Sequence, residues 1–245
     1  WLDYPNGKSI TVEMLLGHTS GLPEFSELPQ HSRNHSPQQS IALAATATPL
    51  FQPGTAWSYC NTNYIMLGVI AEKVTGTSWS QEIQSRFIER LGLEDTSIWV
   101  GSALPNTVPG SRLNCGMEGE PDCVKKPGFE IVPVTDGQDW KVAWSAGSMI
   151  STPSDLALWI HELVNGDLLD AAHRALMTTP TPQSRAALST MPAFGKLKWT
   201  AAGLGLLQYE VDGLGTGWGH EGNINGFVAN VVSISDGRQS IAVTS

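Results

Sequence analysis

Basic side chains are scarce in this sequence of 245 residues. It carries 14 Lys and Arg against 23 Asp and Glu, which gives a net charge of −9. Nucleic acids and anionic membrane surfaces are bound through basic patches, so we expect neither as a partner. The sequence also lacks an apolar run of about 18 residues, and therefore no segment is predicted to span a bilayer.

Patterns that hold metals or cofactors are lacking as well. The six histidines form no H-E-x-x-H pair, and the three cysteines form no C-x-x-C pair. We therefore predict no metal site and no cofactor. The sequence also contains no internal repeat.

The cysteines that are present suggest an exported protein. Cys115 and Cys123 flank the short polar loop CGMEGEPDC, and we interpret them as a disulfide in a secreted or periplasmic protein. The alternative is two free thiols that are close only in sequence. Cys60 is left over and is expected to pack as a small apolar residue.

Helical patterns dominate the first two thirds of the chain. Thr11 is a candidate N-cap, residues 62–74 have apolar side chains at helical spacing, and Gly76 closes that segment. Further helices are predicted for residues 79–88, 152–165 and 171–177. Residues 97–146 resemble a loop.

Strand patterns follow, in residues 203–211, 226–234 and 239–245, and Asp236-Gly237 predicts a hairpin turn between the last two. The fold class is therefore α+β with an antiparallel sheet. We expect a mainly helical subdomain with long loops at 1–150, and a helix plus antiparallel strands at 151–245. The segment 227–234 is apolar nearly throughout, so we expect it to be covered on both faces.

Tyr59 and Asn61 lie where the turn FQPGTAWSYCN meets the helix predicted from residue 62. A phenol can transfer a proton, but to act as a base at neutral pH its pKa must fall by roughly 3 units. Asn61 can hold a substrate amide, or it can serve as the helix N-cap. An ordinary half-buried tyrosine is the alternative for Tyr59.

His220 lies between glycines in GWGHEGNINGF, just before a predicted strand. Glycine lets a ligand approach the backbone closely, and an exposed N–H there could serve as an oxyanion donor. A tight turn with a solvated histidine is the alternative. Ser145 fits a relaxed A-x-S-x-G elbow with His220 after it, which is the order of an α/β-hydrolase triad.

Six segments together resemble the penicillin-recognising serine hydrolases, which include class C β-lactamases, D-alanyl-D-alanine carboxypeptidases and related esterases. They are ITVEMLLGHTSGLPEF, FQPGTAWSYCNTNYIMLGVIAEKVTGTSW, ERLGLEDTSIW, SAGSMISTPSDLALWI, GLGLLQYE and GHEGNINGF. The resemblance implies a β-lactamase/transpeptidase-like fold and acyl transfer through an acyl-enzyme, on a small-molecule or peptide amide or ester.

By this resemblance, Tyr59 and His220 are the catalytic residues. Asn61 looks like the substrate-binding asparagine, and Glu221 and Gly222 complete the third motif. Asn223 matches one oxyanion-hole donor through its backbone N–H. Glu221 stands where the family often has Thr or Ser, so we expect it to repel anionic substrates.

One motif of the family, Ser-x-x-Lys, occurs nowhere in the chain. In the family this motif precedes the segment HTSGLP, so we expect it upstream of this chain and expect the chain alone to be inactive. The C-terminal helix of the family is lacking too, so both ends are expected to be cut, with the missing helices packing on the late strands. A non-catalytic binding or sensor domain that kept the cleft is the alternative.

Overall fold

The computed structural model describes residues 4, 6–32, 34–99, 111–114, 130–133, 140–191, 197–224 and 226–244, with the backbone alone at 111–114, 130–133 and 140–141. Cys115 and Cys123 lie outside these residues, so the predicted disulfide is not described. Within the described residues, no helix is both long and apolar enough to cross a membrane.

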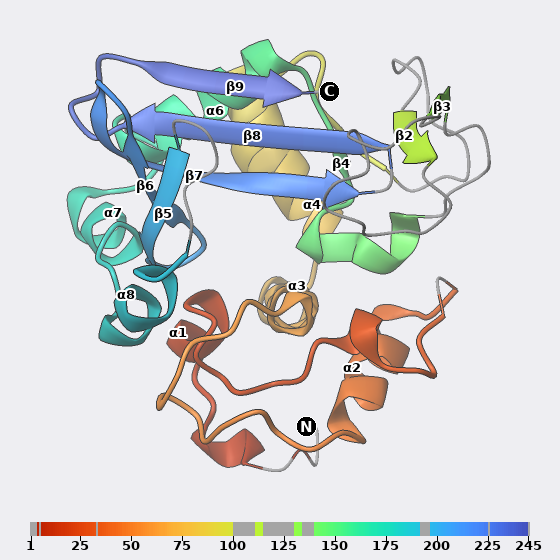
Figure 1. Cartoon of the computed structure of the whole chain (residues 1–245). Helices are drawn as coiled ribbons and strands as arrows, with labels where there is room; N and C mark the ends of the chain where they lie inside the picture. Colours follow the sequence, from red (N-terminus) through yellow and green to blue (C-terminus); the bar gives the residue numbers. More distant parts are fainter. Residues whose placement is uncertain are drawn as a thin grey trace.

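The first part of the chain is helical and surrounds α3, which spans Asn61–Thr75 (Figure 1). Its elements are η1 (Gly7–Ser9), α1 (Val12–Leu16), η2 (Phe25–Glu27), α2 (Pro37–Ala45), α4 (Trp79–Ile83), the π-helical turn η3 (Gln84–Ile88) and α5 (Glu89–Leu91). Thr11 caps α1, and Gly76 and Gly92 end α3 and α5 at positive φ, because glycine has no Cβ to oppose that conformation.

Short elements connect this part to the sheet. β1 (Ser97–Ile98) pairs with β4 (Met149–Ile150), β2 (Ser111–Asn114) pairs with β3 (Glu130–Pro133), and η5 (Trp140–Ala146) precedes β4. The last helices are α6 (Pro153–Val164), α7 (Ala171–Met177) and α8 (Pro182–Leu188). The loop predicted for 97–146 therefore contains short strands and a 3₁₀ segment.

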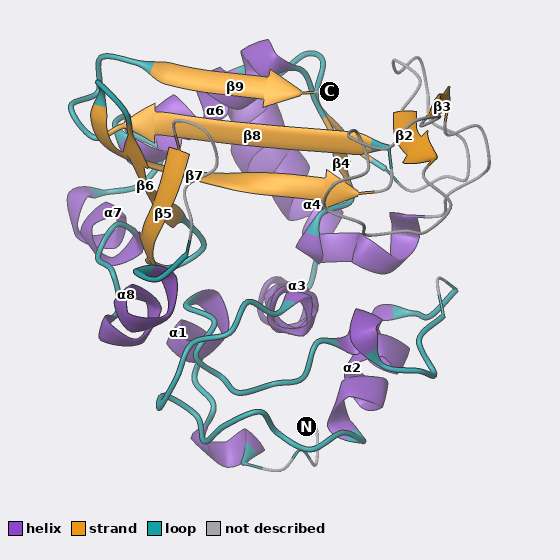
Figure 2. Ribbon diagram, in the orientation of Figure 1, coloured by secondary structure: helices purple, strands orange, loops and turns teal. Residues whose placement is uncertain are grey.

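A five-stranded antiparallel sheet completes the fold, in the order β5-β6-β7-β8-β9 (Figure 2). Its strands are β5 (Leu197–Ala202), β6 (Leu207–Val211), β7 (Gly215–Ile224), β8 (Phe227–Ile234) and β9 (Ser240–Thr244). The predicted hairpin joins β8 to β9, with Gly237 at φ 75°. The α+β prediction is confirmed, whereas the predicted boundary at 150/151 stays a prediction.

The two faces of the sheet have different cores. On one face, Trp218 and Val231 pack against Ile160 and Leu163 of α6. On the other face, Val232 and Ile234 pack with Tyr209, Val211 and Leu188 of α8. The consecutive residues Val231 and Val232 thus enter opposite cores, as the alternation of a strand requires.

The cover of β8 is incomplete toward its N-terminal end. Val228 is 48% exposed, and on neighbouring β9 Ile241 and Val243 are 41% and 59% exposed. The expectation of burial on both faces is therefore right only for residues 231–234. That helices outside this chain cover these side chains stays a prediction.

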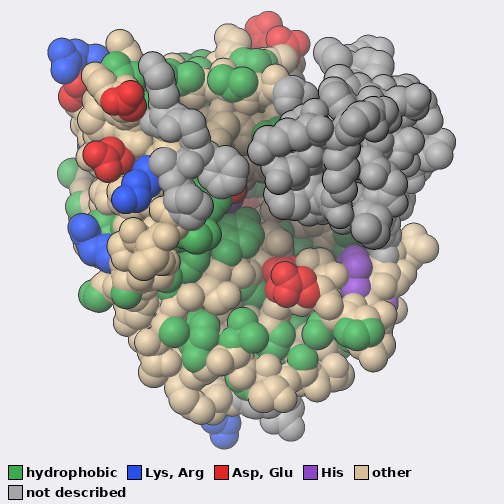
Figure 3. Space-filling view, viewed as in Figure 1, with side chains coloured by type: hydrophobic (Ala, Val, Ile, Leu, Met, Phe, Trp, Pro, Cys, Tyr) green, Lys and Arg blue, Asp and Glu red, His purple; other side chains and the backbone are tan. Residues whose placement is uncertain are grey.

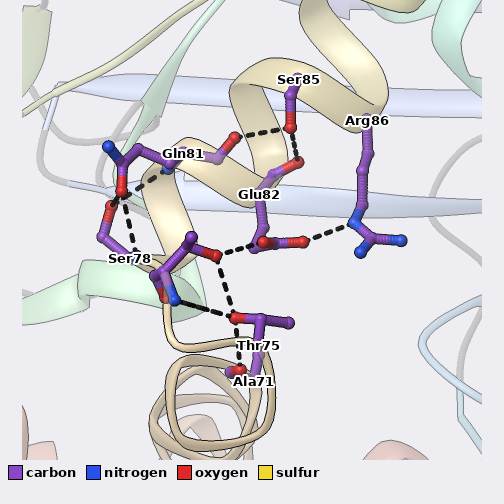
Figure 4. A network of polar contacts seen from close by, with 8 residues as sticks. Ala71, Thr75, Ser78, Gln81, Glu82, Ser85 and Arg86 are labelled. Carbon is purple, nitrogen blue, oxygen red and sulfur yellow. Dashed lines mark hydrogen bonds and ion pairs between the residues drawn. The ribbon is translucent and has the colours of Figure 1, made fainter.

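A polar network fixes the direction of the chain as it leaves α3 (Figure 4). The Thr75 hydroxyl donates to the carbonyl of Ala71 (2.9 Å), and Ser78 forms a capping box with Gln81 at the start of α4. Glu82 then pairs with Arg86 one turn later. These contacts end α3 and begin α4 within three residues, so the C-terminal end of α3 is held in place.

Candidate active site

The candidate site is formed where the N-terminus of α3 meets β7. Tyr59 belongs to the turn before α3, and His220 lies within β7 rather than before a strand, as its local sequence had suggested. Their ring centroids are 5.9 Å apart, with the ring planes at 47°. The rings of two residues far apart in the chain therefore lie close together.

The N-terminus of α3 is capped by a different segment of the chain. Cys60 is the N-cap, but its side chain makes no capping hydrogen bond. Instead, the Glu24 carboxylate accepts a hydrogen bond from the Asn61 backbone N–H (2.5 Å), and His18 Nδ1 accepts one from the Cys60 N–H (3.0 Å). The suggestion that Asn61 caps the helix is therefore wrong, and its side chain is not used for capping.

Buried side chains attach residues 18–25 to α3. The Ser20 hydroxyl donates to Asn63 Oδ1 (2.6 Å), and Thr62 Oγ1 accepts from the Phe25 N–H (3.0 Å). Both α3 partners are almost fully buried. Such buried, paired groups specify one arrangement of loop and helix, because leaving either group unpaired costs about 1–3 kcal/mol.

The phenol of Tyr59 is protonated at neutral pH. Its hydroxyl donates to Asn61 Oδ1 over 3.4 Å. Burial raises the pKa of Tyr59 to about 12, and the negative charges of Glu24 and Glu221 add to the rise. In this chain Tyr59 is thus a hydrogen-bond donor, and it needs a nearby cation before it can act as a base.

His220 is a neutral imidazole with one defined tautomer. Its Nδ1 lies 2.6 Å from the carbonyl oxygen of Glu221, which can only accept, so Nδ1 carries the proton and Nε2 keeps a lone pair. Burial lowers the pKa of His220. Near Tyr59 it therefore supplies a proton acceptor rather than a positive charge.

The other predicted binding residues continue along β7. Glu221 is partly buried, and burial raises the pKa of its carboxyl group. Gly222 and Asn223 follow and are exposed to solvent, paired with Ala229 and Val228 of β8. Their roles in substrate binding stay predictions. In the residues described, no three His, Cys, Asp or Glu side chains are grouped as metal ligands.

In the face shown by Figure 3, the coloured Lys and Arg side chains lie toward the left and at the lower edge, and an acidic side chain lies near the middle.

Ser145 does not form a triad with His220. Its hydroxyl donates to the carbonyl of Tyr64 (2.8 Å) and packs against Gly68 of α3, where an added Cβ would lie 2.2 Å from Ser145 Oγ. The main sheet is antiparallel throughout. The α/β-hydrolase alternative is therefore wrong, because that fold requires a parallel sheet.

Sequence reasoning found Tyr59, Asn61 and His220, but it missed His18 and Glu24. The ring of His18 stacks on Tyr59 with centroids 4.5 Å apart, and Glu24 caps the helix that follows. Both contacts join residues about forty positions apart. The only signal was their place in the segment GHTSGLPEF, which contributed to the family resemblance.

This combination of fold and site defines the class of penicillin-recognising serine hydrolases. The family model described as Beta-lactamase matches residues 1–245. The chain therefore belongs to the Beta-lactamase family, with the β-lactamase/transpeptidase-like fold that the sequence predicted.

Individual relatives agree with this membership. Penicillin-binding protein 4 of Amycolatopsis lactamdurans is 29% identical over 223 residues, which are 89% of this chain and 55% of that protein. A D-stereospecific amidohydrolase from Streptomyces sp. matches with a TM-score of 0.79 and 28% identity, over 98% of this chain and 68% of that one.

Further structures share the fold. The D-amino acid amidase of Ochrobactrum anthropi matches with a TM-score of 0.78 and 24% identity, over 99% of this chain and 66% of that one. The chain thus spans about half the length of the curated relative and about two thirds of these structures.

Proposed function

We propose that these residues form the site of a serine hydrolase that cleaves small amides or esters through an acyl-enzyme. The observation that carries this proposal is the approach of Tyr59 and His220 across the junction of α3 and β7, with Asn61 hydrogen-bonded to the phenol. A donor, an amide and a proton acceptor at one place suit the binding and protonation of an acyl group.

The nucleophile and its lysine must come from a Ser-x-x-Lys sequence that these 245 residues do not contain. Without that lysine, Tyr59 keeps a pKa of about 12, and neutral His220 does not replace the missing charge. Loss of a nucleophile can cost a factor of about a million in rate. The chain by itself is therefore inactive.

The test compares the 245-residue chain with the full-length protein on nitrocefin, a p-nitrophenyl ester and a D-amino-acid amide. We expect a burst of product only from the full-length protein. A burst from the 245-residue chain would refute the assignment of the nucleophile. A full-length protein that binds these compounds without turnover would establish the alternative, a binding or sensor domain.

Neutral substrates are preferred over anionic ones. Glu221 places a carboxylate close enough to influence Tyr59, and like charges repel in a partly desolvated site. This preference suits an amidase better than a β-lactamase. Two related structures are named as a D-stereospecific amidohydrolase and a D-amino acid amidase, the latter also described in complex with L-phenylalanine amide.

The variant Glu221→Thr tests this preference in the full-length protein. We expect the ratio of kcat/KM for a neutral amide or ester to that for a carboxylate-bearing β-lactam to fall. Glu210→Thr, at an exposed position of neighbouring β6, is the matched control. An unchanged ratio in Glu221→Thr would show that Glu221 does not set the preference for neutral substrates.

We also propose that the protein is secreted or periplasmic, with Cys115 bonded to Cys123. The support is the spacing of these two cysteines in a short polar loop. The third cysteine, Cys60, is free and 1% exposed. Titration of the unfolded, unreduced protein should therefore find one thiol, and three thiols would contradict the disulfide.

A further inference from the structure

His18 occupies an unusual place between α1 and the site. It directly follows Gly17, the C-cap of α1, and its backbone has φ 56°, which non-glycine residues adopt only at a cost. Only 4% of its surface is exposed. A buried polar residue keeps a strained conformation only where its surroundings hold it there.

Three contacts of His18 reach three consecutive residues. The His18 carbonyl accepts a hydrogen bond from the Ser58 N–H (3.0 Å), and Nδ1 accepts one from the Cys60 N–H (3.0 Å). Between them, the imidazole stacks on the phenol ring of Tyr59 at 4.5 Å and 28°. One residue therefore holds the backbone N–H groups of the residues before and after Tyr59, and it also holds the Tyr59 ring.

The contact to Cys60 defines the protonation of His18. A backbone N–H only donates, so Nδ1 must carry a lone pair and the ring proton must be on Nε2. Burial lowers the pKa of His18 to about 3, with a smaller contribution from His220. The aromatic rings of Trp57 and Tyr64 also lie beside it, at 6.0 and 5.1 Å.

We propose that His18 is a positioning residue, which fixes the Tyr59 phenol toward His220 by clamping the backbone on both sides of Tyr59 and stacking against its ring. The inference rests on the proposed function, because it assigns Tyr59 to the reaction. His18 itself does not touch the substrate.

A kinetic double-mutant cycle in the full-length protein tests this role. His18→Ala removes the stack and the Nδ1 acceptor, and we expect kcat on the amide to fall about a hundredfold with KM little changed. His18→Asn should recover part of kcat, because asparagine tolerates positive φ and its Oδ1 can accept from the Cys60 N–H. His173→Asn, at an exposed site on α7, is the control for loss of a histidine.

The variants with Tyr59→Phe decide between positioning and general stability. If His18 acts through Tyr59, His18→Ala should lower kcat little further in a protein that already carries Tyr59→Phe. Additive losses, or a fall in KM and kcat that follows the thermal unfolding midpoint, would overturn the proposal.

A second measurement does not depend on activity. Nitrogen NMR of the His18 ring in the 245-residue chain should show the neutral Nε2–H tautomer at neutral and mildly acidic pH. An Nδ1–H tautomer or a protonated ring at neutral pH would refute the clamp. If Tyr59→Phe leaves hydrolysis unchanged while the tautomer is as expected, the proposed function fails and the clamp stands as a structural feature.

Discussion

Glu24 makes the helix cap on which the position of Tyr59 depends, so removing its carboxylate has two separable effects. In Glu24→Ala the N–H of Asn61 loses its acceptor at the N-terminus of α3, and Ser26 loses its acceptor as well. Loss of a helix cap costs about 0.5–2 kcal/mol, and hydrogen bonds to charged groups lie toward the upper end of such values. We therefore expect Glu24→Ala to lower the free energy of unfolding by about 2 kcal/mol.

The expected loss can be measured as a change in thermal unfolding. For a domain of this size, 1 kcal/mol corresponds to about 2–4 °C, so the midpoint of Glu24→Ala should fall by about 4–8 °C. Glu24→Gln keeps an oxygen acceptor and loses only the charge, so its midpoint should fall much less. Glu13→Gln, on the exposed side of α1, is the control for a lost carboxylate.

The second effect, the loss of the negative charge of Glu24, changes the pKa of Tyr59. Because the Glu24 carboxylate raises the pKa of Tyr59, both variants should lower that pKa from about 12. The phenolate absorbance of each variant, minus that of the same variant with Tyr59→Phe, measures this shift. Two results would refute the reasoning about the cap. One is an equal thermal unfolding midpoint for Glu24→Ala and wild type, and the other is an unchanged pKa of Tyr59 in both variants.

Two further predictions concern stability. In Gly219→Ala the added Cβ would lie 1.8 Å from the carbonyl oxygen of Val231. The strands β7 and β8 must then separate, which should lower the free energy of unfolding by about 1–3 kcal/mol or more. The control is Gly222→Ala, in which the nearest neighbour of the added Cβ would be 3.9 Å away, and it should unfold like wild type. In urea unfolding, equal midpoints for both variants would contradict this packing. His18 has a pKa near 6.5 when unfolded and about 3 when folded, so below pH 6.5 the unfolded state binds more protons and stability should fall by about 1.4 kcal/mol per pH unit. His18→Asn should flatten that slope between pH 6.5 and 4, and an unchanged slope would assign the acid sensitivity to other groups.

The elements that could be predicted from sequence are those with local signals. Residues 62–74 have helical apolar spacing and a closing glycine, and α3 spans Asn61–Thr75. Asp236-Gly237 likewise predicted the hairpin that joins β8 to β9. The local sequence did not predict β7, because Gly215, Gly217, Gly219 and Gly222 give it little intrinsic strand preference; only the family resemblance implied a strand at its third motif. Pairing with β6 and β8 decides the conformation of β7.

The site residues that could be predicted are those in the segments that carry the family resemblance. Tyr59, Asn61 and His220 belong to segments that the resemblance identified, and the rings of Tyr59 and His220 lie 5.9 Å apart. Their roles in one active site stay predictions. His18 and Glu24 act through contacts to residues about forty positions away, and no local pattern encodes such contacts. The protonation of Tyr59 likewise depends on surrounding charges and burial.

The central claim is that Tyr59 takes part in acyl transfer at a site shared with His220. Its most direct test is kcat/KM of Tyr59→Phe and Ser145→Ala in the full-length protein on the same amide. We predict near-total loss of activity in Tyr59→Phe and little loss in Ser145→Ala. Wild-type activity in Tyr59→Phe would contradict the account.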